Sequence, residues 1–152
     1  MKKIFAIAIS LLAFVAVASA QPRALGLRIG GGSAFDAEVS YQQSVGANFV
    51  EADLGLYSHA LSATGIYDFV FPLANSFNFY VGPGASLGLY NSVSDSGNTT
   101  VAFTLGVTGQ VGIEYQFAAI PFNISLDWRP YFGVLNGVGF CHGAGLGFRY
   151  RF

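Results

Sequence analysis

The sequence is poor in charge, and lysine occurs only at Lys2 and Lys3. Charged residues make up 10% of the 152 residues, whereas soluble domains carry roughly 25%. Without the two lysines, five arginines face eight acidic residues, which gives a net charge of −3. A chain with so few charges has difficulty covering a soluble surface. No basic patch is present, so nucleic acid is not expected as a partner.

Cysteine and long apolar segments are also scarce. The single cysteine, Cys141, excludes an internal disulfide and is interpreted as an unpaired thiol near a strand end. No segment after residue 20 has the roughly 20 apolar residues of a transmembrane helix. A membrane location would then require a closed barrel, which pairs all of its backbone polar groups between strands.

The first 20 residues have the pattern of a secretory signal peptide. Lys2 and Lys3 precede an apolar stretch over residues 4–17, and Ala18-Ser19-Ala20 is a small-residue cleavage site. We therefore expect residues 1–20 to be removed and residues 21–152 to form a single β-barrel domain.

The end of the chain shows the clearest structural pattern. Apolar residues alternate with glycine and arginine over residues 142–152. A period of two is typical of a β-strand, in which successive side chains lie on opposite faces. One face contains Ala144, Leu146, Phe148, Tyr150 and Phe152, and the other contains Gly143, Gly145, Gly147, Arg149 and Arg151.

Similar alternation recurs along the chain and predicts an all-β fold. Eight strands in about 130 residues is the smallest barrel whose interior is filled by side chains. An even number places both termini at the same end, as in bacterial outer-membrane barrels. We predict an eight-stranded antiparallel up-and-down transmembrane β-barrel, with a bulge or local break at Pro83. The expected strands cover residues 24–31, 36–42, 49–57, 61–71, 77–90, 101–117, 121–134 and 142–152.

The polar face of these strands is expected to point inward. A soluble lipocalin-like barrel would instead bury its apolar face, but the polar face here has too few charges for a solvated surface. Buried charges must be paired, and glycines near the closing strand should leave room for Arg149 and Arg151. The expected interior charge network consists of Arg28, Glu38, Glu51, Asp53, Asp68, Glu114, Asp127, Arg129, Arg149 and Arg151.

Aromatic residues occur on the apolar face near the expected periplasmic ends of nearly all strands. Such rings typically form a girdle at the membrane interface. The expected girdle contains Tyr41, Phe69, Phe71, Phe77, Phe79, Tyr115, Phe117, Phe122, Tyr150 and Phe152.

The signal peptide, the eight alternating segments and the terminal Tyr150-Arg151-Phe152 resemble small outer-membrane barrels of the OmpA/OmpX type. Residues 37–42, 112–117 and 125–130 are similar to small barrel proteins common in Bacteroidetes. The resemblance covers the whole mature chain. It implies insertion by the barrel-assembly machinery, with Phe148, Tyr150 and Phe152 as the assembly signal.

Residues with catalytic or metal-binding chemistry are few. His59 and His142 lie in or beside expected extracellular loops, and a metal site needs three or four convergent ligands. Adjacent Cys141 and His142 would point to opposite faces of a strand, which disfavours a nucleophile pair. Ser58, His59 and His142 are the only candidates for a lipid A-modifying enzyme, and no matching motif surrounds them. We expect no catalytic, cofactor-binding or metal site.

These observations favour an integral outer-membrane protein of a Gram-negative cell. We expect a non-enzymatic structural or surface-interaction role, with both termini in the periplasm and no cofactor. The expected partners are membrane lipids, lipopolysaccharide and the barrel-assembly machinery, and the protein is expected to be a monomer. The alternatives are a porin-like narrow channel for small solutes or ions and the lipid A-modifying enzyme.

Overall fold

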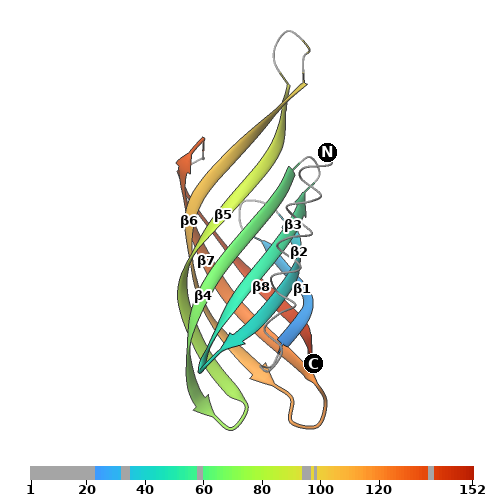
Figure 1. The fold of residues 1–152 in the computed structure, drawn as a ribbon, viewed down its shortest axis with the longest axis vertical. Helices are drawn as coiled ribbons and strands as arrows, with labels where there is room; N and C mark the ends of the chain where they lie inside the picture. The colour runs from blue at the N-terminus through green and yellow to red at the C-terminus, as the bar shows by residue number, and fades with distance from the viewer. Residues whose placement is uncertain (1–22, 32–34, 58–59, 94–96, 98, 137–138) are drawn as a thin grey trace.

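Eight antiparallel strands form a closed barrel in the computed structural model (Figure 1), which describes residues 23–31, 35–57, 60–93, 97, 99–136 and 139–152. Each strand pairs with its neighbour in sequence, so the topology is up-and-down. The predicted fold class is therefore confirmed, and the expected signal peptide lies outside the described residues. The strands are β1 (Arg23–Gly31), β2 (Phe35–Val45), β3 (Asn48–Tyr57), β4 (Ala60–Ala74), β5 (Phe77–Val93), β6 (Thr99–Gln116), β7 (Phe122–Leu135) and β8 (Phe140–Arg151).

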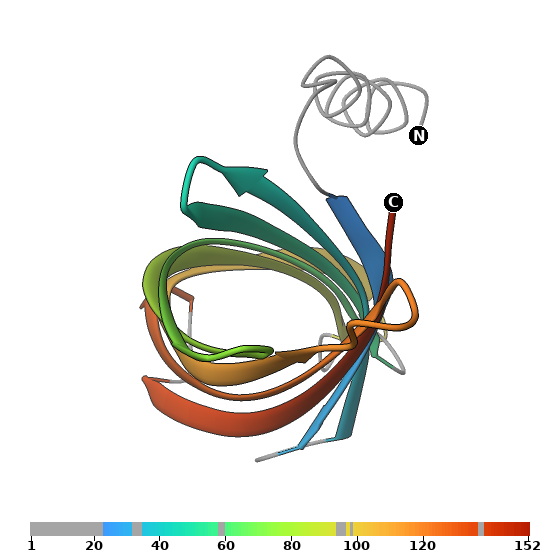
Figure 2. The same ribbon diagram turned by 90° about the horizontal axis from the view of Figure 1, so that it is seen from below.

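The first and last strands close the barrel. β1 pairs with β8 over nearly all of β1 and the part of β8 from Ala144 onward, with Gly26 opposite Arg149 and Leu27 opposite Phe148. Viewed along the barrel, the strands form a ring in which blue β1 lies beside red β8 (Figure 2). Closure leaves no strand edge open along this seam, which is the condition for a sheet to span lipid.

Both described chain ends lie at the same end of the barrel, which we call the terminal end. Arg23 and Phe152 exchange two backbone hydrogen bonds there, of 3.2 and 2.8 Å. The connections over residues 46–47, 75–76 and 117–121 lie at this end too. Gly46 takes a φ of 65°, a left-handed conformation that glycine adopts without strain. At the other end, here called the far end, β5 and β6 extend beyond the other strands (Figure 1).

Side chains alternate between the interior and the outer surface along each strand. In β7, Asn123, Ser125 and Asp127 are buried, while Leu126 and Trp128 are exposed. The same pattern ends β8, as the sequence period predicts. No helix among the described residues is long and apolar enough to cross a membrane.

The strands differ from the prediction mainly at their ends. β2 continues to Val45 because a two-residue turn connects it directly to β3. At Pro83 the β4–β5 ladder is interrupted, but it resumes in the same register, so the predicted local break is present without a bulge. Proline removes one backbone donor and adds no residue, which leaves the register unchanged. The register shifts lie instead at Pro72/Ala74 and Leu105/Gly106.

Candidate functional site

The barrel interior contains a layer of charged side chains. All of the charges predicted to lie inside are buried except Arg151, which is half-buried. Burying a charge is costly unless opposite charges and hydrogen bonds compensate it. The buried residues of the predicted set are Arg28, Glu38, Glu51, Asp53, Asp68, Glu114, Asp127, Arg129 and Arg149.

Arg129 on β7 forms the centre of this layer. Its Nη1 donates to Glu38 Oε2 at 3.1 Å, and its Nη2 donates to Glu51. The same Nη2 lies 2.6 Å from Asp53 Oδ2. Because these carboxylates belong to β2 and β3, one guanidinium crosses the lumen from the opposite wall. The planar fork of arginine suits such contacts with several carboxylates.

Arg28 on β1 extends the same layer. It donates to Glu38 Oε2 at 3.0 Å, and its Nε and Nη2 donate to Asp127 Oδ1 at 3.1 and 2.5 Å. To reach β7 its guanidinium passes over Gly145 on the intervening β8. A Cβ atom at residue 145 would lie 2.3 Å from Arg28 Cζ. The absence of a side chain there is therefore what allows Arg28 to reach Asp127.

Arg149 lies one layer closer to the terminal end. It is fully buried, and it donates to Ser40 Oγ at 2.8 Å and to Ser125 Oγ at 2.7 Å. Its Nη2 lies 3.0 Å from Glu51 Oε1. A Cβ on Gly147 would lie 2.5 Å from Arg149 Nη1. The expectation that glycines leave room for Arg149 is thus met.

The same expectation was wrong for Arg151. The second arginine beside a β8 glycine is Arg28, next to Gly145, and Arg151 lies further out at the mouth of the barrel. The reason is spacing, because inward positions two residues apart differ by about 7 Å along a strand. Arg151 therefore lies one such step nearer the terminal mouth than Arg149.

Asp68 on β4 differs from the other carboxylates of the layer. It is fully buried, and its only hydrogen bond to a described side chain comes from Gln110 Nε2 at 3.4 Å. Its Oδ1 has no hydrogen-bond partner, and it forms no ion pair with any residue that the structure describes. Gln110 also accepts a hydrogen bond from Arg129 Nε, so the amide links Asp68 to the network.

Polar side chains carry the network from the centre to the terminal mouth. Asn123 Nδ2 donates to Glu114 Oε2 at 2.9 Å and lies 3.4 Å from Gln42 Oε1. Gln42 in turn donates to Glu51 at 2.7 Å. Alternation places these amides on the inward face, but a neutral amide carries no charge signal in the sequence that would mark it as part of the network.

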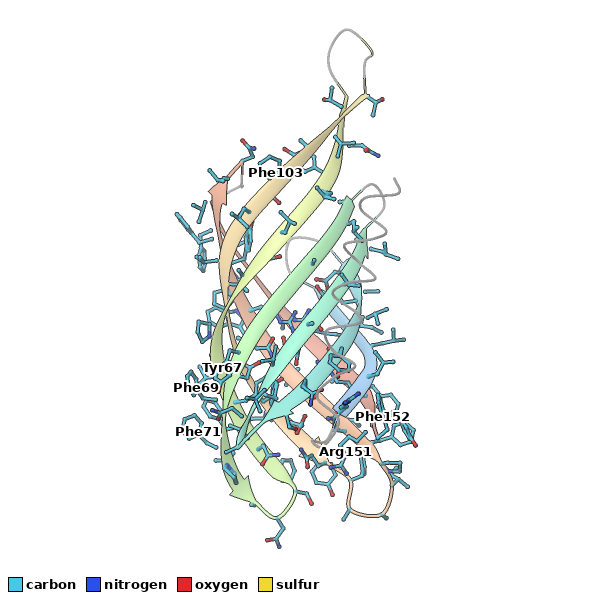
Figure 3. All side chains as sticks on the ribbon, in the orientation of Figure 1. Tyr67, Phe69, Phe71, Phe103, Arg151 and Phe152 are labelled. Atoms are coloured by element: carbon cyan, nitrogen blue, oxygen red, sulfur yellow. The ribbon has the colours of Figure 1, made fainter. Side chains whose placement is uncertain are left out.

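A cavity of about 160 Å³ opens at the terminal mouth. Arg151 and Glu114 both line it, and Gln116 lies between them. Arg151 projects at the terminal end near Phe152 (Figure 3). The other lining residues are Arg23, Ala24, Gln42, Ser44, Phe49 and Asn123.

The interior also contains apolar groups. The rings of Phe49 and Tyr80 meet edge to face, with centroids 5.4 Å apart, and Ile66 is buried as well. Alternation places Ile66 and Tyr80 on the inward face, and Phe49 follows from its spacing to Glu51. These bulky groups fill space beside the charged layer.

The outer surface is apolar on every strand. Exposed leucine, isoleucine, valine and aromatic side chains follow each strand from the terminal end toward the far end. Tyr67, Phe69 and Phe71 project outward from β4 near the terminal end (Figure 3). Aromatic ring contacts connect neighbouring strands there, including Phe71–Phe79, Phe77–Tyr115 and Phe122–Tyr150.

Of the candidate catalytic residues, the structure describes Cys141 and His142. His142 is exposed, and its ring lies near those of Trp128 and Phe140. Cys141, a free thiol, pairs with Tyr131 across the β7–β8 ladder. Ser58 and His59 lie outside the described residues. Within the described part of the chain, no group of histidine, cysteine and carboxylate side chains could hold a metal ion.

The fold is similar to that of solved β-barrels. The N-terminal β-barrel domain of Pseudomonas aeruginosa OprF matches with a TM-score of 0.65 and 17% identity, over 86% of this chain and 97% of that chain. Neisserial surface protein A (NspA) matches with a TM-score of 0.59 and 14% identity, over 86% of this chain and 94% of that chain. At these identities the likeness concerns the fold alone.

No protein-family model matches the chain, and no curated protein matches it either. The resemblance to small barrels of the OmpA/OmpX type is confirmed at the level of the fold. The additional likeness to Bacteroidetes barrels has no support in these two structures.

Proposed function

We propose that the chain is an integral outer-membrane β-barrel with a structural or surface-interaction role and no catalytic activity. The observation that carries this proposal is the exposed apolar surface on all eight strands around a polar, ion-paired interior. In water an apolar surface of this extent would drive association. In lipid it is stable, because the closed barrel pairs the backbone groups between its strands.

The proposed orientation places the terminal end in the periplasm. β5 and β6 extend beyond the other strands at the far end (Figure 1), and bacterial outer-membrane barrels have short periplasmic turns and longer extracellular loops. The aromatic rings near the terminal end would then lie at the periplasmic interface of the outer membrane, where amphipathic rings are favoured. Membrane lipids and lipopolysaccharide are the proposed surroundings of a monomer.

Extraction from native membranes tests the location. We expect the protein to sediment with outer-membrane fractions, to resist high salt and alkaline carbonate, and to dissolve only in detergent. Release by salt alone would contradict the proposal and favour a soluble barrel. Cleavage by an external protease at the loops of the far end, in intact cells, is the result expected from the proposed orientation.

A narrow channel is the first alternative, and the side chains that occupy the lumen argue against it. Arg129 reaches from β7 to carboxylates on β2 and β3, so its side chain lies across the lumen. Phe49, Tyr80 and Ile66 occupy further interior space. In planar-bilayer recordings we expect no large, reproducible conductance steps from the wild-type protein, and such steps would favour the channel.

A lipid A-modifying enzyme is the remaining alternative. The described candidate, His142, lies on the outer surface among aromatic rings. We expect the lipid A of cells that overexpress the protein to be unchanged by mass spectrometry. A new lipid A species that disappears with His142→Ala would favour the enzyme.

A further inference from the structure

Two residues of opposite charge line the cavity at the terminal mouth. Glu114 and Arg151 line the same cavity, yet neither forms an ion pair within 4.0 Å with any residue that the structure describes. The arginines and most carboxylates of the central layer, by contrast, are paired directly. The two charges are therefore available to a molecule that enters from the terminal end.

Gln116 holds these two charges apart. Arg151 Nη1 donates to Gln116 Oε1 at 2.9 Å, and Gln116 Nε2 donates to Glu114 Oε1 at 2.6 Å. Arg151 Nη2 is fixed as well, because it donates to the backbone oxygen of Phe117 at 3.0 Å. The side chains are thus positioned before any ligand arrives, which reduces the entropy lost on binding.

Two residues that line the cavity also carry a buried polar atom without a hydrogen-bond partner among the described residues. Arg151 Nε is buried without an acceptor, and Asn123 Oδ1 is buried without a donor, although Asn123 is only 1% exposed. Glu114 accepts from Asn78, Gln116 and Asn123. An ionised carboxylate has about four acceptor sites, so Glu114 can accept one further hydrogen bond.

We propose that this cavity binds a small zwitterion of the α-amino acid class. The ligand carboxylate accepts from Arg151, and the ligand ammonium donates to Glu114. The volume of about 160 Å³ limits the ligand to a small side chain, since sites for drug-sized ligands measure roughly 300–1,000 Å³. The inference requires only the folded barrel and is independent of its location in the cell.

Calorimetric titration of the purified barrel in detergent with L-alanine tests the proposal. We expect saturable binding to the wild type. Charge-assisted hydrogen bonds are lost in Glu114→Gln and in Arg151→Gln, so each variant should bind about tenfold more weakly or worse. Acetate and ethylammonium, which present one charge each, should both bind more weakly than alanine.

Control variants distinguish the loss of this site from a remote change of charge and from unfolding of the barrel. Asp36→Asn removes a charge near Arg28 and away from the cavity, so it should leave alanine binding unchanged. Ser44→Phe fills the cavity without altering its charges and should abolish binding, which keeps the test decisive if a charge variant fails to fold. Folding is checked by far-ultraviolet circular dichroism. The proposal would be overturned if the wild type showed no saturable binding or if both charge variants bound alanine as tightly as the wild type. It would also be overturned if acetate bound as tightly as alanine.

Discussion

Arg28 on β1 forms an ion pair with Asp127 on β7, two strands away, at an Nη2–Oδ1 distance of 2.5 Å. The contact passes over Gly145 on β8, which lies opposite Asp127 in the β7–β8 ladder. A pair between strands that are not adjacent ties three strands together at the closing seam. The glycine is thus as important to the contact as the two charged groups.

Gly145→Ala should destabilise the barrel by about 1–3 kcal/mol, the usual cost of overpacking a filled interior. The added methyl group would meet the Arg28 guanidinium, which Asp127 and Glu38 hold in place. The free energy of unfolding in urea measures the effect. Gly65→Ala is the matched control, because a Cβ at residue 65 meets no atom within 4 Å. Equal losses for the two variants would contradict the interpretation.

Arg129→Met should destabilise the barrel by about 3–5 kcal/mol, because it leaves buried carboxylates without their cation. Glu38, Glu51 and Asp53 all lose a contact. The double variant Arg129→Met, Asp53→Asn should be more stable than the single variant, since one unpaired charge is then removed. Urea unfolding of both variants tests this ordering. If the double variant were the less stable one, Asp53 would not depend on Arg129.

The sequence period predicted the strands and the inward face, but it predicted little of how the charged side chains pair inside the barrel. Alternation placed Glu38, Asp127 and Arg129 on the inward face, because a strand has only two faces. It could not predict that Arg28 meets Asp127, since contacts between non-adjacent strands depend on the register of every intervening pair. Arg149 and Arg151 look equivalent in sequence, yet one is fully buried and the other lies at the mouth. No motif in the chain identified the terminal cavity, because its lining comes from β1, β2, β3, β6, β7 and β8.

Leu126→Arg should cost about 2–4 kcal/mol if the outer face of β7 contacts the bilayer midplane. Leu126 is exposed on the outer surface between Phe122 and Trp128. Val134→Arg provides the control on the same strand and the same face, near the far end, where the cost should be about 0–1 kcal/mol. Unfolding of the two variants from lipid bilayers measures the difference. An equal cost at both depths would contradict the proposed membrane position.

Deletion of Phe152 should lower the amount of folded protein in the membrane, for two separable reasons. The residue exchanges backbone hydrogen bonds with Arg23 across the seam, and its exposed ring stacks on that of Tyr150. Phe152→Ala keeps the backbone bonds and removes only the ring. If Phe148, Tyr150 and Phe152 act as an assembly signal, the alanine variant should also accumulate poorly in membranes, although the purified protein refolds normally in detergent. Normal membrane levels of Phe152→Ala, with reduced levels of the deletion, would assign the effect to seam closure and would contradict an aromatic signal.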